Sequence, residues 1–124
     1  MSMHYMLLMT ETADDFAKRT HPEEAGAYWG AWNAYIGALQ QAGVIVKGDG
    51  LQRPETATTV RVRAGERHVQ DGPFADTKEQ LAGYLVIEVE DLDAALAWAA
   101  RSPAAASASV EVRPVLPPPG GATA

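Results

Sequence analysis

The segment Asp71–Gln80, which reads DGPFADTKEQ, holds the residues whose types best suit chemistry. Asp71 is the strongest candidate for a catalytic carboxylate, because a carboxylate that closes over an apolar cavity can serve as a general acid or base. The alternative is structural, with Asp71 hydrogen-bonded inside its own turn. His68 lies three residues earlier, on a predicted strand whose end the two residues straddle, and it is the second candidate catalytic residue. For this histidine, a plain position on the strand surface is the alternative.

A second set of candidates consists of residues that could hold a ligand. Strand geometry puts Arg61 and Arg63 on one face, about 7 Å apart along the chain. Two converging guanidinium groups can bind a carboxylate or a phosphate. Cross-strand pairing with Glu88 or Glu111 is the alternative use of these charges. The remaining candidates for contact with a ligand are Phe74, Lys78, Tyr84 and His4.

The sequence contains no recognisable motif for a metal or a cofactor. None of the histidines His4, His21 and His68 has a second ligand at the spacing that metal sites use. There is also no Gly-rich phosphate loop and no Gly-x-Ser-x-Gly motif. We therefore expect neither a metal nor a cofactor.

A long helix is predicted over residues 22–42. Pro22 suits the first helical position, and Gly43 is the expected C-terminal cap. Apolar residues recur at helical spacing, at Trp29, Trp32, Ile36 and Leu39. This spacing favours a core position for the two tryptophans. The alternative is an aromatic pocket that they would line together with Tyr28 and Tyr35.

Most of the other predicted elements are strands. Apolar runs and alternation predict strands at Tyr5–Thr10, Val44–Lys47, Thr58–Arg63, Arg67–Gln70, Gly83–Glu90 and Val110–Val115. A second helix is expected after a cap at Asp91 or Asp93, with its end at Pro103. Residues 10–20 are interpreted as a polar connection, and Thr77–Gln80 as a capped helical turn.

The predicted order of elements is β-α-β, a hairpin, and then β-α-β. Right-handed crossovers put both helices on the same side of the sheet, which gives an α+β fold of the ferredoxin-like sandwich type. The other face of the sheet is expected to carry Arg61, Arg63 and either Glu88 or Glu111 among apolar neighbours. A bare, half-polar face favours a homodimer around a shared cavity, which an unknown small molecule would occupy.

Length and composition limit the class of protein further. The 124 residues suit one domain, expected at 1–116, followed by a disordered Pro/Gly-rich tail at 117–124. The net charge of −6 disfavours nucleic acid as a partner, and no apolar run is long enough for a membrane span. Without cysteine or a signal-peptide pattern, the chain is expected to be cytoplasmic.

The segments Asp71–Phe74, Asp76–Leu81 and Gly83–Tyr84 together resemble the signature of DGPF-type proteins of the YCII-related superfamily. The resemblance covers roughly residues 3–117. It implies a dimeric α+β barrel and, for these proteins, a frequent link with extracytoplasmic-function sigma factors. The flanking segments that agree include Tyr5–Leu8, Ala42–Val44, Gly48–Leu51, Thr58–Arg61 and Ser109–Val115.

The resemblance also bears on activity. The wider superfamily includes small degradative enzymes that are thought to use a His–Asp pair, with the histidine in the first helix. The comparable stretch here, Trp32–Ile36, contains no histidine. Two hypotheses follow. The favoured one is an accessory protein that binds a small molecule. The other is a cofactor-free lyase- or isomerase-like enzyme with Asp71 as acid or base and Arg61, His68 or Tyr84 positioning the ligand.

Overall fold

The computed structural model describes residues 2–117; the predicted tail beyond them lies outside the described residues. This part of the chain builds a four-stranded sheet from β1 (Met3–Thr12), β2 (Ile45–Gly50), β5 (Glu79–Val89) and β6 (Val110–Pro114). The strand order is β2-β5-β1-β6, and each pair of neighbours is antiparallel. The α+β class predicted from the sequence is therefore confirmed.

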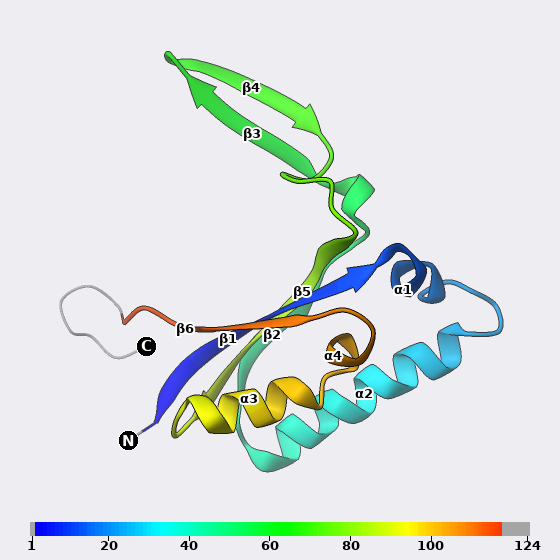
Figure 1. The fold of residues 1–124 in the computed structure, drawn as a ribbon, viewed down its shortest axis with the longest axis vertical. Coiled ribbons are helices and arrows are strands. Elements are labelled where there is room, and N and C mark those ends of the chain that lie inside the picture. Colours follow the sequence, from blue (N-terminus) through cyan, green and yellow to red (C-terminus); the bar gives the residue numbers. More distant parts are fainter. Residues whose placement is uncertain (1, 118–124) are drawn as a thin grey trace.

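Helices cover one face of this sheet (Figure 1). The two longer ones are α2 (Ala25–Ala42) and α3 (Leu92–Ala100), and the shorter ones are α1 (Ala13–Lys18) and α4 (Pro103–Ser107). Alternate residues of β1, from Tyr5 to Met9, point toward the helices and are buried. They form the core with residues from β5 and the helices, namely Tyr35, Leu39, Leu85, Ile87, Val89, Ala95, Ala99 and Ala104.

The helix ends follow local sequence signals, some of which the sequence analysis used. Gly43 ends α2 in the left-handed conformation at φ 72°, as expected, and Asp91 caps α3. The polar connection expected at 10–20 is instead the end of β1 followed by α1. A reciprocal capping box between Thr12 and Asp15 starts that helix. Pro103 follows the end of α3 but also opens α4, because Ser102 caps it and Pro suits the first turn.

The hairpin of β3 (Thr58–Arg63) and β4 (Glu66–Asp71) forms a separate two-stranded sheet. It projects away from the four-stranded sheet, on the side opposite the helices, and the short 3-10 turn η1 (Pro54–Thr56) lies at its base (Figure 1). Arg61 and Arg63 therefore do not lie on the face of the main sheet, and that part of the prediction is wrong. The prediction failed because strand signals do not reveal which sheet a strand joins.

The predicted helical turn at Thr77–Gln80 is also wrong. β5 begins at Glu79, and its first residues pair with the end of β1, with Glu79 opposite Thr12. The Thr77 hydroxyl donates to the carbonyl oxygen of Glu79 at 2.6 Å, and the Gln80 amide donates to the carbonyl oxygen of Ala75 at 2.8 Å. The polar side chains that suggested a capping box thus tie a loop together, because pairing with β1 outweighs the local helical preference.

Candidate functional site

Three of the candidate residues lie together on one face of the hairpin. Arg61 and His68 are direct cross-strand partners, and their side chains share a face because side chains alternate along a strand. The guanidinium of Arg61 lies 5.5 Å from the centre of the Phe74 ring. His68 and Phe74 are exposed, Phe74 at 81%, and Arg61 is half-buried. This group is an open surface of the protomer rather than an enclosed site.

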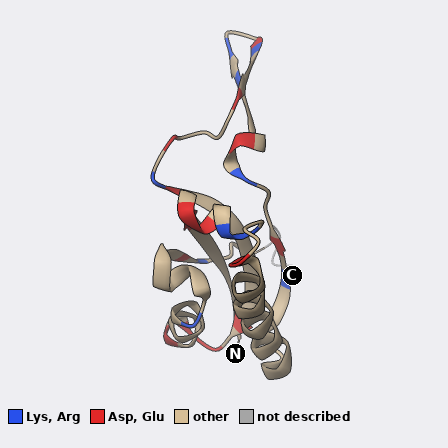
Figure 2. Ribbon diagram, turned by 90° about the vertical axis from the view of Figure 1, so that its right-hand side faces the viewer, with Lys and Arg blue, Asp and Glu red and all other residues tan. Residues whose placement is uncertain are grey.

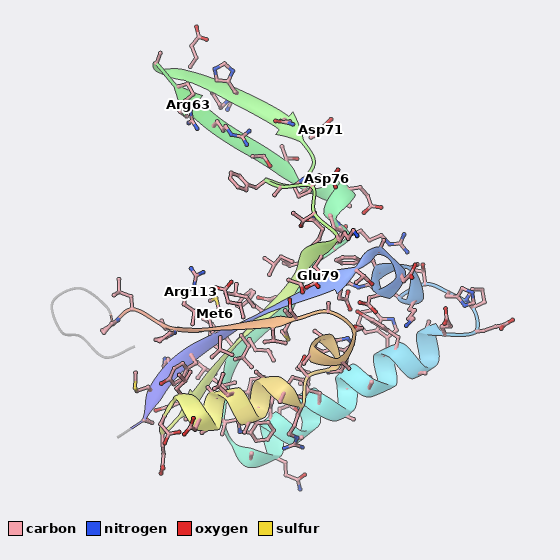
Figure 3. The ribbon with its side chains drawn as sticks, in the orientation of Figure 1. Met6, Arg63, Asp71, Asp76, Glu79 and Arg113 are labelled. Atoms are coloured by element: carbon pink, nitrogen blue, oxygen red, sulfur yellow. The ribbon has the colours of Figure 1, made fainter. Side chains whose placement is uncertain are left out.

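Asp71 does not meet His68. It is the last residue of β4 and pairs with Thr58. The odd separation of the two residues along one strand puts Asp71 on the hairpin face opposite His68. Asp71 is exposed at the base of the hairpin (Figure 3). Within the described protomer, the two candidate catalytic residues are therefore separated.

The open face of the four-stranded sheet holds two further candidates. His4 lies 3.7 Å from the carboxylate of Glu88. The Tyr84 hydroxyl donates to Asp49 at 2.7 Å, and this hydrogen bond raises the pKa of Tyr84. Lys78 is exposed in the loop before β5. Neither His4 nor Lys78 therefore joins the residues on the hairpin.

The same face carries a hydroxyl–carboxylate cluster that the sequence analysis missed. Glu79 Oε1 accepts hydrogen bonds from the hydroxyls of Thr10 at 2.9 Å and Ser109 at 2.6 Å. These two bonds hold the pKa of Glu79 below its ordinary value. Figure 3 shows Glu79, with Met6 and Arg113, on the side of the sheet that faces away from the helices.

A cleft lies elsewhere, between α2 and the β2–β5 edge of the sheet. We call it the α2 cleft. Its volume is about 580 Å³, within the range of sites for small organic molecules. Aromatic residues of α2 line one side, and backbone and aliphatic residues of the sheet line the other. The lining includes Glu11, Arg19, Tyr28, Trp29, Trp32, Asn33, Gln40, Asp49, Gly50 and Gln52.

The cleft exists because the sheet edge beneath α2 carries few side chains. Gly48, Gly50, Ala82 and Gly83 line it. At Gly48 a Cβ atom would lie 2.4 Å from the Leu85 side chain and 2.7 Å from the carbonyl oxygen of Tyr84, so this close strand approach requires glycine. The space that larger side chains would fill between helix and sheet therefore stays open.

A buried ionic cluster forms one end of the α2 cleft. Glu11 continues the inward-facing series of β1 and is only 2% exposed. Arg19, directly after α1, donates to Glu11 Oε1 from Nε at 3.2 Å and from Nη2 at 2.9 Å. The hydroxyl of Tyr28 on α2 donates to the other carboxylate oxygen. Across residues 2–117, no buried side-chain nitrogen or oxygen is left without a partner.

This cluster is electrically balanced and serves to hold elements together. The remaining donors of Arg19 reach the carbonyl oxygens of Leu51 and Ala82, which lie after β2 and within β5. Burial, followed by the hydrogen bond to Glu11, raises the pKa of Tyr28 to about 12. Tyr28 is therefore a proton donor at neutral pH rather than a base. The cluster joins β1, α2, β5 and the segment after β2 at the end of the cleft.

The aromatic residues of α2 that line the cleft do not all lie in the core, as the helical spacing had favoured for the two tryptophans. Leu39 is fully buried, but Trp29 is 45% exposed and lines the cleft with the partly buried Trp32. The alternative of an aromatic pocket thus holds for Trp29, Trp32 and Tyr28, whereas Tyr35 is in the core and donates to the carbonyl oxygen of Trp98. The exposed indole is nevertheless fixed, because Trp29 Nε1 donates to the carbonyl oxygen of Arg19 at 3.0 Å.

Sequence reasoning missed Glu11 and Arg19 altogether. A signal was present for Glu11, because it follows Tyr5, Leu7 and Met9 at alternate positions and therefore shares their inward face. A carboxylate on the core face of a strand requires a charged partner, since an unpaired buried charge is costly. No comparable pattern identifies Arg19, whose approach to Glu11 depends on the turn through α1.

No group of three His, Asp or Glu side chains in residues 2–117 is arranged to hold a metal ion. Within the same range, none of the helices has both the length and the apolar character that a membrane span requires.

Comparison with known proteins identifies the family. The model of the YCII-related domain matches residues 3–118, which is nearly the whole chain, so the chain belongs to the YCII-related domain family. A relative in Rhizobium meliloti (strain 1021), the uncharacterized protein R00369, is 49% identical over 61 residues. These residues make up 48% of this chain and 49% of the relative, so the match spans about half of each protein.

Proposed function

We propose that this YCII-related domain protein binds a small molecule in the α2 cleft. The observation that carries the proposal is an open space of about 580 Å³ walled by a fixed, exposed tryptophan and closed at one end by a balanced buried ion pair. An exposed indole costs hydration free energy unless something covers it. The cleft combines an apolar wall with a few polar groups, as ligand sites commonly do.

We also propose a ferredoxin-like fold and a homodimer of the α+β-barrel type. The strand order β6-β1-β5-β2 with two β-α-β units supports the fold. The open sheet face supports the dimer, because the half-buried Met6 and Leu8 lie on it, where a solvated face would carry mainly polar residues. The projecting hairpin adds exposed Val60, Val62 and Val69 to the surface available to a second copy.

The catalytic alternative stays a prediction. A role for Asp71 as acid or base requires an enclosed carboxylate, and in the protomer it is exposed. A second copy packed against the hairpin would have to provide that enclosure. The link to sigma-factor regulation, which the resemblance implies, likewise stays a prediction.

Thermal denaturation in the presence of a collection of small molecules tests the binding proposal. A compound that binds the folded protein at a hundredfold excess over its Kd raises Tm by several degrees, at least about 5 °C. We expect such compounds to lose their effect in Gly50→Leu. Gly50 lines the cleft, and a Cβ atom there meets nothing within 4 Å, so the leucine fits without strain and narrows the cleft.

Gly37→Leu is the matched control. Gly37 lies on α2 outside the cleft lining, and a Cβ atom there also meets nothing within 4 Å. Compounds should stabilise this variant as much as the wild type. A collection in which no compound distinguishes Gly50→Leu from Gly37→Leu would contradict the proposal.

A further inference from the structure

The charges around the α2 cleft decide which ligands it can accept. Among the described residues that line the cleft, Arg19 is the single cation, and Glu11 is the anion that binds it. The carboxylate of Asp49 is bound to the Tyr84 hydroxyl on the open face of the sheet. Each of the three guanidinium nitrogens of Arg19 already donates to a protein oxygen, including both bonds to Glu11. An anionic ligand would therefore lose its hydration without gaining a free cationic partner, which is unfavourable.

The helix that roofs the cleft adds no charge. α2 has 18 residues and none of them is Asp, Glu, Lys or Arg, so the helix appears in a single neutral colour in Figure 2. Its polar contributions to the cleft are the amides of Asn33 and Gln40, and Gln52 contributes another amide from the segment after β2. Amides donate and accept hydrogen bonds without charge, and they match carbonyl, hydroxyl or amide groups of a ligand.

The tryptophan wall favours a flat ring system. The indole of Trp29 is fixed by its hydrogen bond to Arg19, and Tyr28 packs edge-on against it with ring centres 4.8 Å apart at 88°. The ring is therefore held in place before a ligand arrives, so little side-chain freedom is lost on binding. Opposite it, Gly48, Gly50 and Gly83 present backbone without side chains. A planar aromatic molecule can occupy the slot between these surfaces.

We infer that the α2 cleft selects neutral, planar aromatic molecules that carry an uncharged hydrogen-bonding group, and that it rejects anionic ones. This inference rests on the proposed function, because it names the ligand class for the same cleft. Three features account for this selection. The guanidinium of Arg19 is already hydrogen-bonded to protein oxygens, α2 carries no charged side chain, and the indole of Trp29 is held in place by a hydrogen bond.

Two fluorescent probes with the same ring system test the inference. N-phenyl-1-naphthylamine is neutral, and 8-anilinonaphthalene-1-sulfonate is its sulfonated counterpart. We expect the neutral probe to bind the wild-type protein and the sulfonate to bind at least about tenfold more weakly. The difference should persist at high salt, because salt screens the long-range repulsion from the net charge of −6 but does not replace a missing buried partner.

Variants locate the binding. Gly50→Leu should abolish binding of the neutral probe, and Gly37→Leu should leave it unchanged. Trp29→Phe should weaken it by about two- to tenfold through loss of indole contact, whereas Trp98→Phe should not, because Trp98 lies on α3 outside the cleft.

The possible failures are distinguishable. If the sulfonate binds as tightly as the neutral probe and Gly50→Leu abolishes both, the inferred selection is overturned while the binding function stands. If neither probe binds in a manner that depends on position 50, the ligand class is wrong. The thermal screen with other compounds then decides separately whether the cleft binds any small molecule.

Discussion

Glu11 and Arg19 form the most buried ion pair among the described residues. Their side chains are 2% and 13% exposed, and the shortest nitrogen–oxygen distance between them is 2.9 Å. Breaking a buried ion pair by removing one partner typically costs about 3–5 kcal/mol, because the remaining charge is left without compensation. We therefore expect Arg19→Met to lower the free energy of unfolding by that amount, measured by denaturant titration.

Arg63→Met is the control for this prediction. Arg63 is exposed on the hairpin, where its guanidinium donates to the neighbouring carbonyl oxygen of Val62. A change within about 0.5 kcal/mol is expected, as for most surface substitutions. Equal effects of the two substitutions on the free energy of unfolding would show that the buried Glu11–Arg19 pair does not stabilise the fold.

Asp15 gives a prediction about pH. Burial acts to raise its pKa, but hydrogen bonds from Thr12 and Ser107 outweigh burial and hold the pKa below the ordinary value of 3.8. A lowered pKa in the folded state stabilises the protein above the unfolded pKa, and this contribution disappears as the pH falls through the folded pKa. Asp15→Asn should therefore be less stable by about 1–2 kcal/mol at neutral pH.

The difference between wild type and Asp15→Asn should shrink once the pH falls below ~4, where the wild-type carboxyl gains its proton. Thermal unfolding measured across this pH range provides the check. Asp14→Asn is the matched control, because Asp14 lies in the same first turn of α1 but is exposed. A stability gap for Asp15→Asn that does not depend on pH would contradict the assignment.

At the scale of single residues, the sequence indicates the protein family better than it indicates which residues contact one another. The DGPFADTKEQ segment correctly indicated the family, yet its residues spread over the hairpin, a loop and β5. Asp71 and His68 were both candidates for a catalytic role, but alternation within β4 puts them on opposite faces. The end of the cleft depends on Glu11 and Arg19, which come together only because α1 turns the chain back over β1. That approach is a tertiary event with no local signal.

At the scale of elements, α2 contains glycines in its interior, where glycine has a low helix propensity. Gly30 and Gly37 are exposed inside the helix, and a Cβ atom at either position would meet nothing within 4 Å. Replacing an interior helical glycine with alanine removes unfolded-state freedom and improves helix propensity. We expect Gly30→Ala and Gly37→Ala each to raise the free energy of unfolding by about 0.5–1 kcal/mol in denaturant titration.

Gly43→Ala should lower the free energy of unfolding instead of raising it. Gly43 ends α2 at φ 72°, a left-handed conformation that is strained for residues with a side chain. The substitution is expected to lower the stability by about 1 kcal/mol. Destabilisation by Gly30→Ala or Gly37→Ala would instead indicate that a second molecule packs closely against that face of α2.

The elements show where sequence patterns are sufficient and where they are not. The end of α2 at Gly43 and the start of α3 at Asp91 were predicted because caps are local. The hairpin strands were also predicted, but their separation from the main sheet was not. Strand alternation records which residues share a face, and it contains no information on which strand becomes the neighbour. The predicted core position of Trp29 failed for a similar reason. Helical spacing shows which side chains share a face of the helix, but it does not show whether the sheet packs against that face.

At the scale of the whole molecule, the helices cover one face of the sheet and leave the other open, with the hairpin projecting on the open side (Figure 1). The open face is a mixture of apolar residues and charge pairs, among them Met6 and Leu8 beside His4–Glu88 and Glu111–Arg113. An isolated two-stranded hairpin is only marginally stable in water. A second copy on the open side would bury both features, which argues for the proposed homodimer.

Met6→Arg tests this arrangement, because Met6 lies on the open face and points away from the core residues Tyr5 and Leu7. A charge introduced into a desolvated, symmetric contact appears twice, so we expect the dimer Kd to rise at least about 100-fold in sedimentation experiments. Leu92→Arg is the control, since Leu92 is 47% exposed on α3, on the opposite side of the sheet. Circular dichroism must show that both variants remain folded. A wild-type protein that sediments as a monomer, or a folded Met6→Arg dimer of unchanged affinity, would exclude the open face as the dimer contact.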